Sequence, residues 1–141
     1  MSAGPKTMIP PFSKVSHISF SVRDAQVSAR FWQDVFGFEV LESVAGEGWS
    51  GVVMLHPATA VVLEVQQHEA NSGEAFDPAR TGFDHLGLMV VDPSELEVWR
   101  KHFERAGVTH SPIAVRDYGA VLTFKDPDGI QFEMFHRAGH P

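Results

Sequence analysis

Cysteine is absent from this 141-residue chain. Without thiols there is no disulfide framework and no thiolate metal site, so any metal ion must be held by imidazole and carboxylate groups. Basic residues are also scarce, because 11 Lys and Arg stand against 18 Asp and Glu, for a net charge of −7. This balance lacks the basic surface that nucleic acids and anionic membranes require, and it favours a small-molecule partner.

Long apolar runs are missing as well. No segment has the length needed to cross a bilayer, and residues 1–14 contain three prolines but no apolar stretch of the signal-peptide kind. With 43% hydrophobic and 21% charged residues, the composition is that of a globular protein. We therefore expect a cytoplasmic protein with a flexible N-terminal arm over 1–14, one domain over 15–136 and a short tail over 137–141.

The main feature that is present is a pattern that occurs twice. Residues 15–22 and 83–90 each have a strand pattern, with a histidine in third place and alternating apolar residues after it. Downstream of each lies a second strand-like run, at 61–65 and at 130–134, with one carboxylate among apolar neighbours. The two histidines and the two glutamates are separated by nearly the same distance in sequence, about half the chain. The four residues are His17, Glu64, His85 and Glu133.

The remaining elements follow the same order in both halves. A helix is expected over 25–36, with Asp24 as its N-cap and Gly37 just after its end. A second helix is expected to begin at Asp92-Pro93-Ser94-Glu95 and to end at Gly107. Further strands are expected at 38–44, 52–55, 60–67, 110–115, 120–124 and 130–135. The sequence therefore predicts two βαβββ modules, over 15–67 and 83–136, joined by a connector over 68–82.

All four candidate residues share one geometric property. Side chains alternate along a strand, and in each of the four strands the apolar row lies opposite the His or Glu. If the apolar rows pack under the helices, the four side chains project from the uncovered sheet face. A single strand histidine or glutamate is more typical of a structural or solvated residue. Two carboxylates buried together are unfavourable without a cation, so a shared metal ion would explain the pattern.

Two imidazoles and two carboxylates suit Zn²⁺, Ni²⁺, Co²⁺, Mn²⁺ or Fe²⁺, and a six-coordinate ion would keep two positions open for water or substrate oxygens. A turn sequence at 126–129, Asp-Pro-Asp-Gly, leads into the last strand. Together with Phe-Asp-His-Leu-Gly-Leu at 83–88, these residues resemble the vicinal oxygen chelate superfamily. That superfamily includes glyoxalase I, extradiol dioxygenases, and bleomycin and fosfomycin resistance proteins.

The resemblance implies an α+β fold in which two βαβββ modules form a curled mixed sheet around a metal-centred cleft, with the helices on the outer face. It also implies a glyoxalase-like ligand set of His17, Glu64, His85 and Glu133. We expect a homodimer, with the four ligands supplied by one protomer or by two.

By the same resemblance, the expected activity is that of a metal-dependent lyase or isomerase of glyoxalase type. The metal would polarise neighbouring oxygens of a small substrate while a carboxylate transfers a proton. Glu133 is the first choice for this base and Glu64 the second. Tyr118 and Arg116 precede the strand at 120–124 and are expected to orient the substrate. Trp49 is a candidate lid, since it lies in an expected mobile loop over 45–51 that contains three glycines.

Two other functions stay open. An extradiol-type dioxygenase would use His17, His85 and Glu133 alone, because its iron site keeps three positions open. Glu64 as a fourth ligand favours the lyase or isomerase. A binding protein of the antibiotic-resistance type is the third reading. Ser21 stands where glutathione-dependent glyoxalases have an arginine, so the sequence departs from the pattern for glutathione conjugates.

Overall fold

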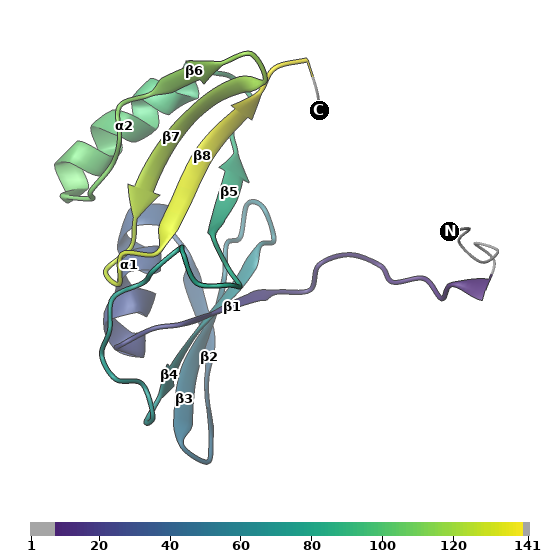
Figure 1. Cartoon of the computed structure of the whole chain (residues 1–141), viewed down its shortest axis with the longest axis vertical. Coiled ribbons are helices and arrows are strands. Elements are labelled where there is room, and N and C mark those ends of the chain that lie inside the picture. Colours follow the sequence, from purple (N-terminus) through teal and green to yellow (C-terminus); the bar gives the residue numbers. More distant parts are fainter. Residues whose placement is uncertain (1–7, 140–141) are drawn as a thin grey trace.

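In the computed structural model, which describes residues 8–139, the chain folds into two βαβββ modules (Figure 1). The first module contains β1 (Ile18–Ser21), α1 (Ala25–Phe36), β2 (Glu39–Gly46), β3 (Trp49–Leu55) and β4 (Val62–His68). The second contains β5 (His85–Met89), α2 (Glu95–Ala106), β6 (Ala114–Arg116), β7 (Gly119–Lys125) and β8 (Gln131–Arg137). The fold class and the element order predicted from the sequence are confirmed. Parts of the expected arm (1–7) and tail (140–141) lie outside the described residues.

Each module forms one mixed four-stranded sheet, with strand orders β1-β4-β3-β2 and β5-β8-β7-β6. In both sheets the first strand runs parallel to the last, and the other neighbours are antiparallel. Ser19 pairs with Glu64, and Gly87 pairs with Glu133. The register is therefore equivalent in the two modules. The two sheets do not join into the single curled sheet that the sequence led us to expect (Figure 1).

The first helix begins and ends at the predicted residues because both ends are capped locally. The carboxylate of Asp24 accepts hydrogen bonds from the backbone N–H groups of Gln26 and Val27, at 3.0 and 3.2 Å. Gly37 adopts φ 75°, the left-handed conformation that ends a helix most readily at glycine.

The second helix begins at Glu95, two residues later than Pro93, which was expected at its first position. The carboxylate of Glu95 reaches back to accept hydrogen bonds from the backbone N–H groups of Val91 and Asp92. Asp92 in turn accepts from the backbone N–H of Ser94. The 92–95 segment is thus a hydrogen-bonded turn that precedes the helix. Among residues 8–139, no helix has the length and hydrophobicity needed to span a membrane.

Two expectations for the strands are wrong. The predicted mobile loop at 45–51 is a tight hairpin turn at 47–48, and Trp49 is the first residue of β3. Gly48 supplies the left-handed residue of this turn, at φ 78°, whereas Gly51 lies within the strand. The strand expected at 110–115 is reduced to β6 and one bridge between His110 and Phe124, since Pro112 has no N–H for a continuous ladder.

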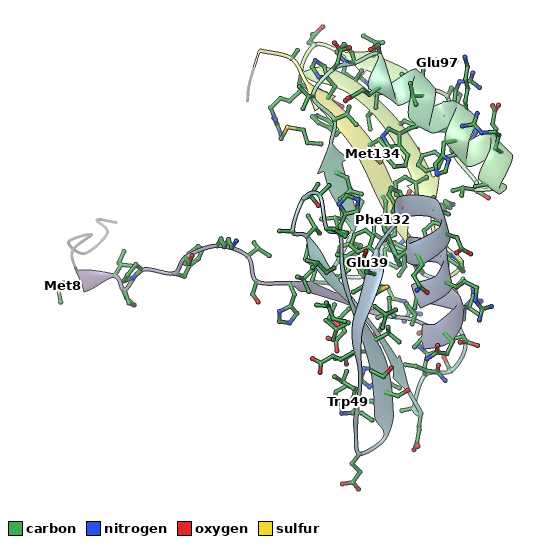
Figure 2. All side chains as sticks on the ribbon, turned by 180° about the vertical axis from the view of Figure 1, so that it is seen from behind. Met8, Glu39, Trp49, Glu97, Phe132 and Met134 are labelled. Carbon is green, nitrogen blue, oxygen red and sulfur yellow. The ribbon has the colours of Figure 1, made fainter. Side chains whose placement is uncertain are left out.

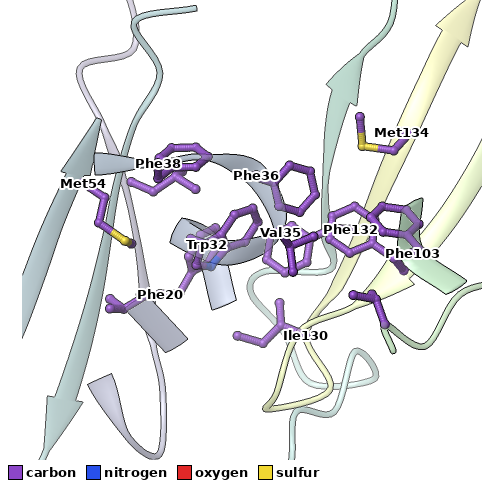
Figure 3. Packing of buried hydrophobic residues seen from close by; sticks show 14 of the residues in the cluster. Phe20, Trp32, Val35, Phe36, Phe38, Met54, Phe103, Ile130, Phe132 and Met134 are labelled. Carbon is purple, nitrogen blue, oxygen red and sulfur yellow. The ribbon is translucent and has the colours of Figure 1, made fainter. Parts of the chain in front are cut away.

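A single aromatic core joins the modules on the side of the helices (Figure 3). The ring of Trp32, on α1, lies 4.9 Å from that of Phe132, on β8. Phe36 lies 5.0 Å from Trp99 and 5.2 Å from Phe124. These contacts bury the apolar row of each sheet. The opposite face of each sheet remains uncovered by its own chain, as the alternation pattern predicted.

A polar contact also links the modules. Asp128, in the turn between β7 and β8, accepts hydrogen bonds from the backbone N–H of Arg23 at 3.0 Å and from its Nε at 2.8 Å. Its other oxygen accepts a hydrogen bond from the hydroxyl of Ser28, at 3.2 Å. Asp128 and Ser28 are both buried. The predicted turn therefore also fixes the second module against the start of α1.

Candidate metal and substrate site

His85 and Glu133 lie together on the uncovered face of the second sheet, and we call them the second half-site. His85 Nε2 is 3.4 Å from Glu133 Oε1. Its other ring nitrogen, Nδ1, is 2.6 Å from a carboxylate oxygen of Asp84. The hydrogen bond to Asp84 raises the pKa of His85 above its ordinary value; partial burial opposes this increase and the charge of Glu133 adds to it. Asp84 thus orients the ring so that Nε2 points towards Glu133.

Glycine keeps the space beside Glu133 open. Gly87 is its partner on β5, and a Cβ added there would lie 3.9 Å from Glu133 Oε1. On the other side the partner is Thr123, on β7. The Glu133 side chain is 22% exposed to solvent. An ion or substrate therefore has access to this carboxylate from the uncovered face.

Glu64 and His17 occupy the matching positions in the first module, and we call them the first half-site. Glu64 is 8% exposed, although it lies on the uncovered sheet face. Its Oε1 accepts a hydrogen bond from Gln66 Nε2 at 3.0 Å, and a Cβ on Gly51 would come within 3.3 Å of its Oε2. Within the described part of the chain it has no cationic partner at ion-pair distance.

His17 lies immediately before β1 instead of inside it, and it is exposed. It stands two residues before Ser19, the partner of Glu64, just as His85 stands two residues before Gly87. Its Nδ1 is 2.9 Å from the hydroxyl of the neighbouring Ser16. The position of His17 in the register is thus that of His85, with a hydroxyl where His85 has a carboxylate.

The two half-sites do not meet within one chain. Over residues 8–139, no cluster of three or more His, Asp or Glu side chains is close enough to hold a metal ion. The structure brings His85 to Glu133, but it brings neither of them to the first half-site. One chain in this conformation therefore presents two separate half-sites of suitable chemistry, and the metal-centred cleft stays a prediction for an assembly of two chains.

Two stacked aromatic rings and a cation lie beside the second half-site, and we call them the aromatic step: Tyr118, Phe135 and Arg137. Glu133, Phe135 and Arg137 alternate along β8 and share its uncovered face. The ring of Tyr118 stacks on that of Phe135, with centroids 5.9 Å apart and planes 8° from parallel. The guanidinium of Arg137 lies 5.3 Å from the centre of the Phe135 ring. Of these three residues only Tyr118 was predicted to contact substrate, although the spacing of Phe135 and Arg137 from Glu133 was the available signal in the sequence.

The other two residues expected to contact substrate have different surroundings. Arg116 is exposed and donates to the backbone carbonyl of Val115. Trp49 lies at the hairpin end of the first sheet, opposite His68 (Figure 2). Its ring covers Gly46, because a Cβ at that glycine would overlap the indole. Trp49 is therefore part of the hairpin, and a role in covering a substrate stays a prediction.

Paired βαβββ modules with a His and a Glu in equivalent register are the architecture that the sequence resemblance implied. The family model of the glyoxalase/bleomycin resistance protein/dioxygenase superfamily matches residues 14–134. The chain belongs to this superfamily.

Proteins of similar sequence are named for different activities. The chain is 31% identical over 130 residues to a lactoylglutathione lyase of Arabidopsis thaliana, a match that covers 89% of this chain and 44% of that protein. It is 26% identical over 125 residues to a putative ring-cleaving dioxygenase of Bacillus subtilis, covering 87% and 39%. The chain thus spans less than half the length of these relatives.

Solved structures support the fold. A glyoxylase/bleomycin resistance protein/dioxygenase domain from Frankia sp. superposes with a TM-score of 0.83 at 28% identity, covering 90% of this chain and 99% of that one. The fosfomycin resistance protein FosX of Listeria monocytogenes, as a mutant complexed with Mn(II) and 1S,2S-dihydroxypropylphosphonic acid, gives a TM-score of 0.68 at 21% identity. That match covers 92% and 93% of the two chains, and it is a likeness of fold alone.

Proposed function

We propose that this protein is a metal-dependent lyase or isomerase of the glyoxalase type, which moves a proton on a small substrate with neighbouring oxygens. The observation that carries the proposal is the repeated His and Glu register, with Glu64 nearly buried and held by one neutral donor. A carboxylate in that position is stabilised by a cation. The lactoylglutathione lyase among the relatives supports the same class of chemistry.

The residues that would hold the ion are His17, Glu64, His85 and Glu133. A divalent cation bound there would polarise a substrate oxygen as a Lewis acid. Asp84 holds the His85 ring in one orientation and keeps Nε2 on the side of Glu133. Glu133 is the more accessible carboxylate and can reach a bound substrate, whereas Gln66 holds Glu64 in place, so Glu133 is the first choice for the base.

A second copy of the chain would complete the site. The half-sites are separate in one chain, and the uncovered faces of both sheets are available to a partner. In a homodimer, the first half-site of each protomer would face the second half-site of the other. Two equivalent four-ligand sites would result, each made of two imidazoles and two carboxylates.

The aromatic step beside Glu133 would bind the remainder of the substrate. Tyr118 and Phe135 offer a flat apolar surface, and Arg137 offers a cation at its far end. Among the described residues, Arg137 has no carboxylate at ion-pair distance. We therefore expect a substrate with an apolar portion that packs on these rings and an anionic group that the guanidinium of Arg137 binds.

A ring-cleaving dioxygenase is the second candidate, favoured by the similarity to the putative enzyme of Bacillus subtilis. It would need only His17, His85 and Glu133 as ligands. Glu64 separates the two proposals, because a fourth protein ligand occupies a position that oxygen and a catechol would share.

The test begins with metal analysis of protein purified without chelator, followed by titration of metal-free protein with Mn²⁺. Glu133→Gln should abolish tight binding, whereas Glu47→Gln, in the hairpin turn, should leave it unchanged. Activity is then assayed with 2-oxo aldehyde adducts in deuterated water and with catechols in an oxygen electrode. Solvent deuterium in the product without oxygen uptake supports the lyase or isomerase. Oxygen uptake supports the dioxygenase, and ligand binding without turnover contradicts both.

A further inference from the structure

The N-terminal segment, residues 8–17, leaves the body of the molecule on the side opposite the helices (Figures 1 and 2). Its apolar side chains are exposed to solvent, including Phe12 at 88%. In the described structure, its side chains make one hydrogen bond, between Ser16 and His17. The segment therefore carries apolar groups that its own chain does not cover.

The spacing of these groups is regular. Ile9, Phe12 and Val15 recur every third residue, and all three are exposed. Pro10 and Pro11 fix their own φ angles and restrict the residue before each of them to extended conformations. A polyproline II helix has three residues per turn, so the three apolar side chains would share one edge of it. The segment thus carries three regularly spaced, exposed apolar side chains, and its two prolines hold the chain extended between the first two of them.

An apolar groove of about 830 Å³ lies between the end of α1, one side of α2 and the strand β5. Aromatic rings line it, from Phe36, Phe38 and Trp99. Met89 and Val98 at its border are 63% and 65% exposed. β5 is also an edge strand of its sheet. Aromatic-lined grooves are the surfaces that bind polyproline II segments in other proteins.

We propose that the N-terminal segment of one protomer docks in this aromatic groove of a second copy of the chain. Distances along the two segments agree with that assignment. If the segment runs antiparallel to β5 of the partner and Phe12 lies beside Met89, His17 lies close to His85. The five extended residues from Phe12 to His17 span about 16 Å, and the four from Met89 to His85 span about 13 Å. Docking would then hold the first half-site against the second half-site of the other chain.

This proposal rests on the dimer of the proposed function, but it does not need the metal. Since the chain has no cysteine, single cysteines can report the contact. A tagged Phe12→Cys chain is mixed with an untagged Val98→Cys chain, in the presence of EDTA, and oxidised. We expect a disulfide-linked mixed dimer. Adding Ile9→Ser and Val15→Ser to the Phe12→Cys chain should slow its formation by about tenfold or more, because apolar burial is lost.

The control replaces Val98→Cys by Glu47→Cys, at the far hairpin of the first sheet, and should give little cross-linking. Equal cross-linking to both cysteines would overturn the docking. So would an internal disulfide in the Phe12→Cys, Val98→Cys double variant, since the segment would then fold back on its own groove. Specific cross-linking without Mn²⁺ binding by the wild type would overturn only the proposed function. Mn²⁺ binding without cross-linking would overturn only the docking.

Discussion

Asp126 is a buried carboxylate in the turn before β8. One of its oxygens accepts hydrogen bonds from the backbone N–H groups of Asp128 and Ile130, at 2.9 and 2.8 Å. Burial raises its pKa to about 7; the charge of Asp128 adds to the increase, while the backbone hydrogen bonds and Arg23 oppose it. Asp126 therefore keeps its proton in the folded protein over a pH range in which the unfolded chain has lost it.

This difference predicts the pH dependence of stability. Between about pH 4 and pH 7 the folded state binds more protons at Asp126 than the unfolded state, so the free energy of unfolding falls as pH rises. Asp126→Asn keeps an acceptor oxygen and removes the titration. Urea unfolding at pH 5 and pH 8 should show a decline in the wild type that is larger than in Asp126→Asn, by on the order of 2–4 kcal/mol. Equal declines would contradict this assignment, and Asp77→Asn, at an exposed position, serves as the control.

Asp84 acts on the proposed metal site through His85. Asp84→Asn should lower the pKa of His85, because the hydrogen bond that the Asp84 carboxylate accepts from the imidazole is the largest cause of the raised value. Measuring the Mn²⁺ affinity over a range of pH separates this change in proton competition from the orienting effect. Loss of the orienting carboxylate should weaken Mn²⁺ binding about tenfold. Calorimetry and NMR titration of metal-free protein measure the two effects, and an unchanged affinity would remove Asp84 from the site.

At the scale of elements, the Asp128 contact is the polar link between the modules. Asp128→Ala would leave the Arg23 N–H and the Ser28 hydroxyl without their acceptor. Because the Arg23 side chain is 41% exposed, we expect Asp128→Ala to lower the free energy of unfolding by about 2 kcal/mol, which is below the range for fully buried ion pairs. Glu74→Ala breaks the exposed Arg80–Glu74 pair and should cost less than about 1 kcal/mol. Equal losses in denaturant unfolding would show that the Asp128 contact contributes no more than a surface ion pair.

Local signals predicted the elements best. Asp24 and Gly37 predicted the first and last residues of α1 correctly, since capping depends on nearby backbone groups. Strand limits depend on partners far along the chain, which is why the Trp49 hairpin and the short β6 differ from expectation. For the site, strand alternation correctly placed His85 beside Glu133. It did not reveal that the half-sites stay separate, because the packing of one module on the other depends on long-range contacts such as Trp32 with Phe132.

At the scale of the whole molecule, the helices and the aromatic core lie on one side and the uncovered sheet faces on the other (Figure 1). Glu64, Glu133 and their histidines all belong to the uncovered faces. The N-terminal segment extends from that same side. A second chain is therefore needed both to complete the proposed metal site and to cover this surface.

Complementation between two inactive chains tests this claim directly. One variant carries His17→Ala and Glu64→Gln, and the other carries His85→Ala and Glu133→Gln. In a mixed dimer, one site would contain all four substitutions and the other would contain none. Each variant alone should fail to bind Mn²⁺, and a co-refolded mixture should regain one tight site per mixed dimer. Folded mixed dimers that bind no Mn²⁺, under conditions in which the wild type does, would contradict the account.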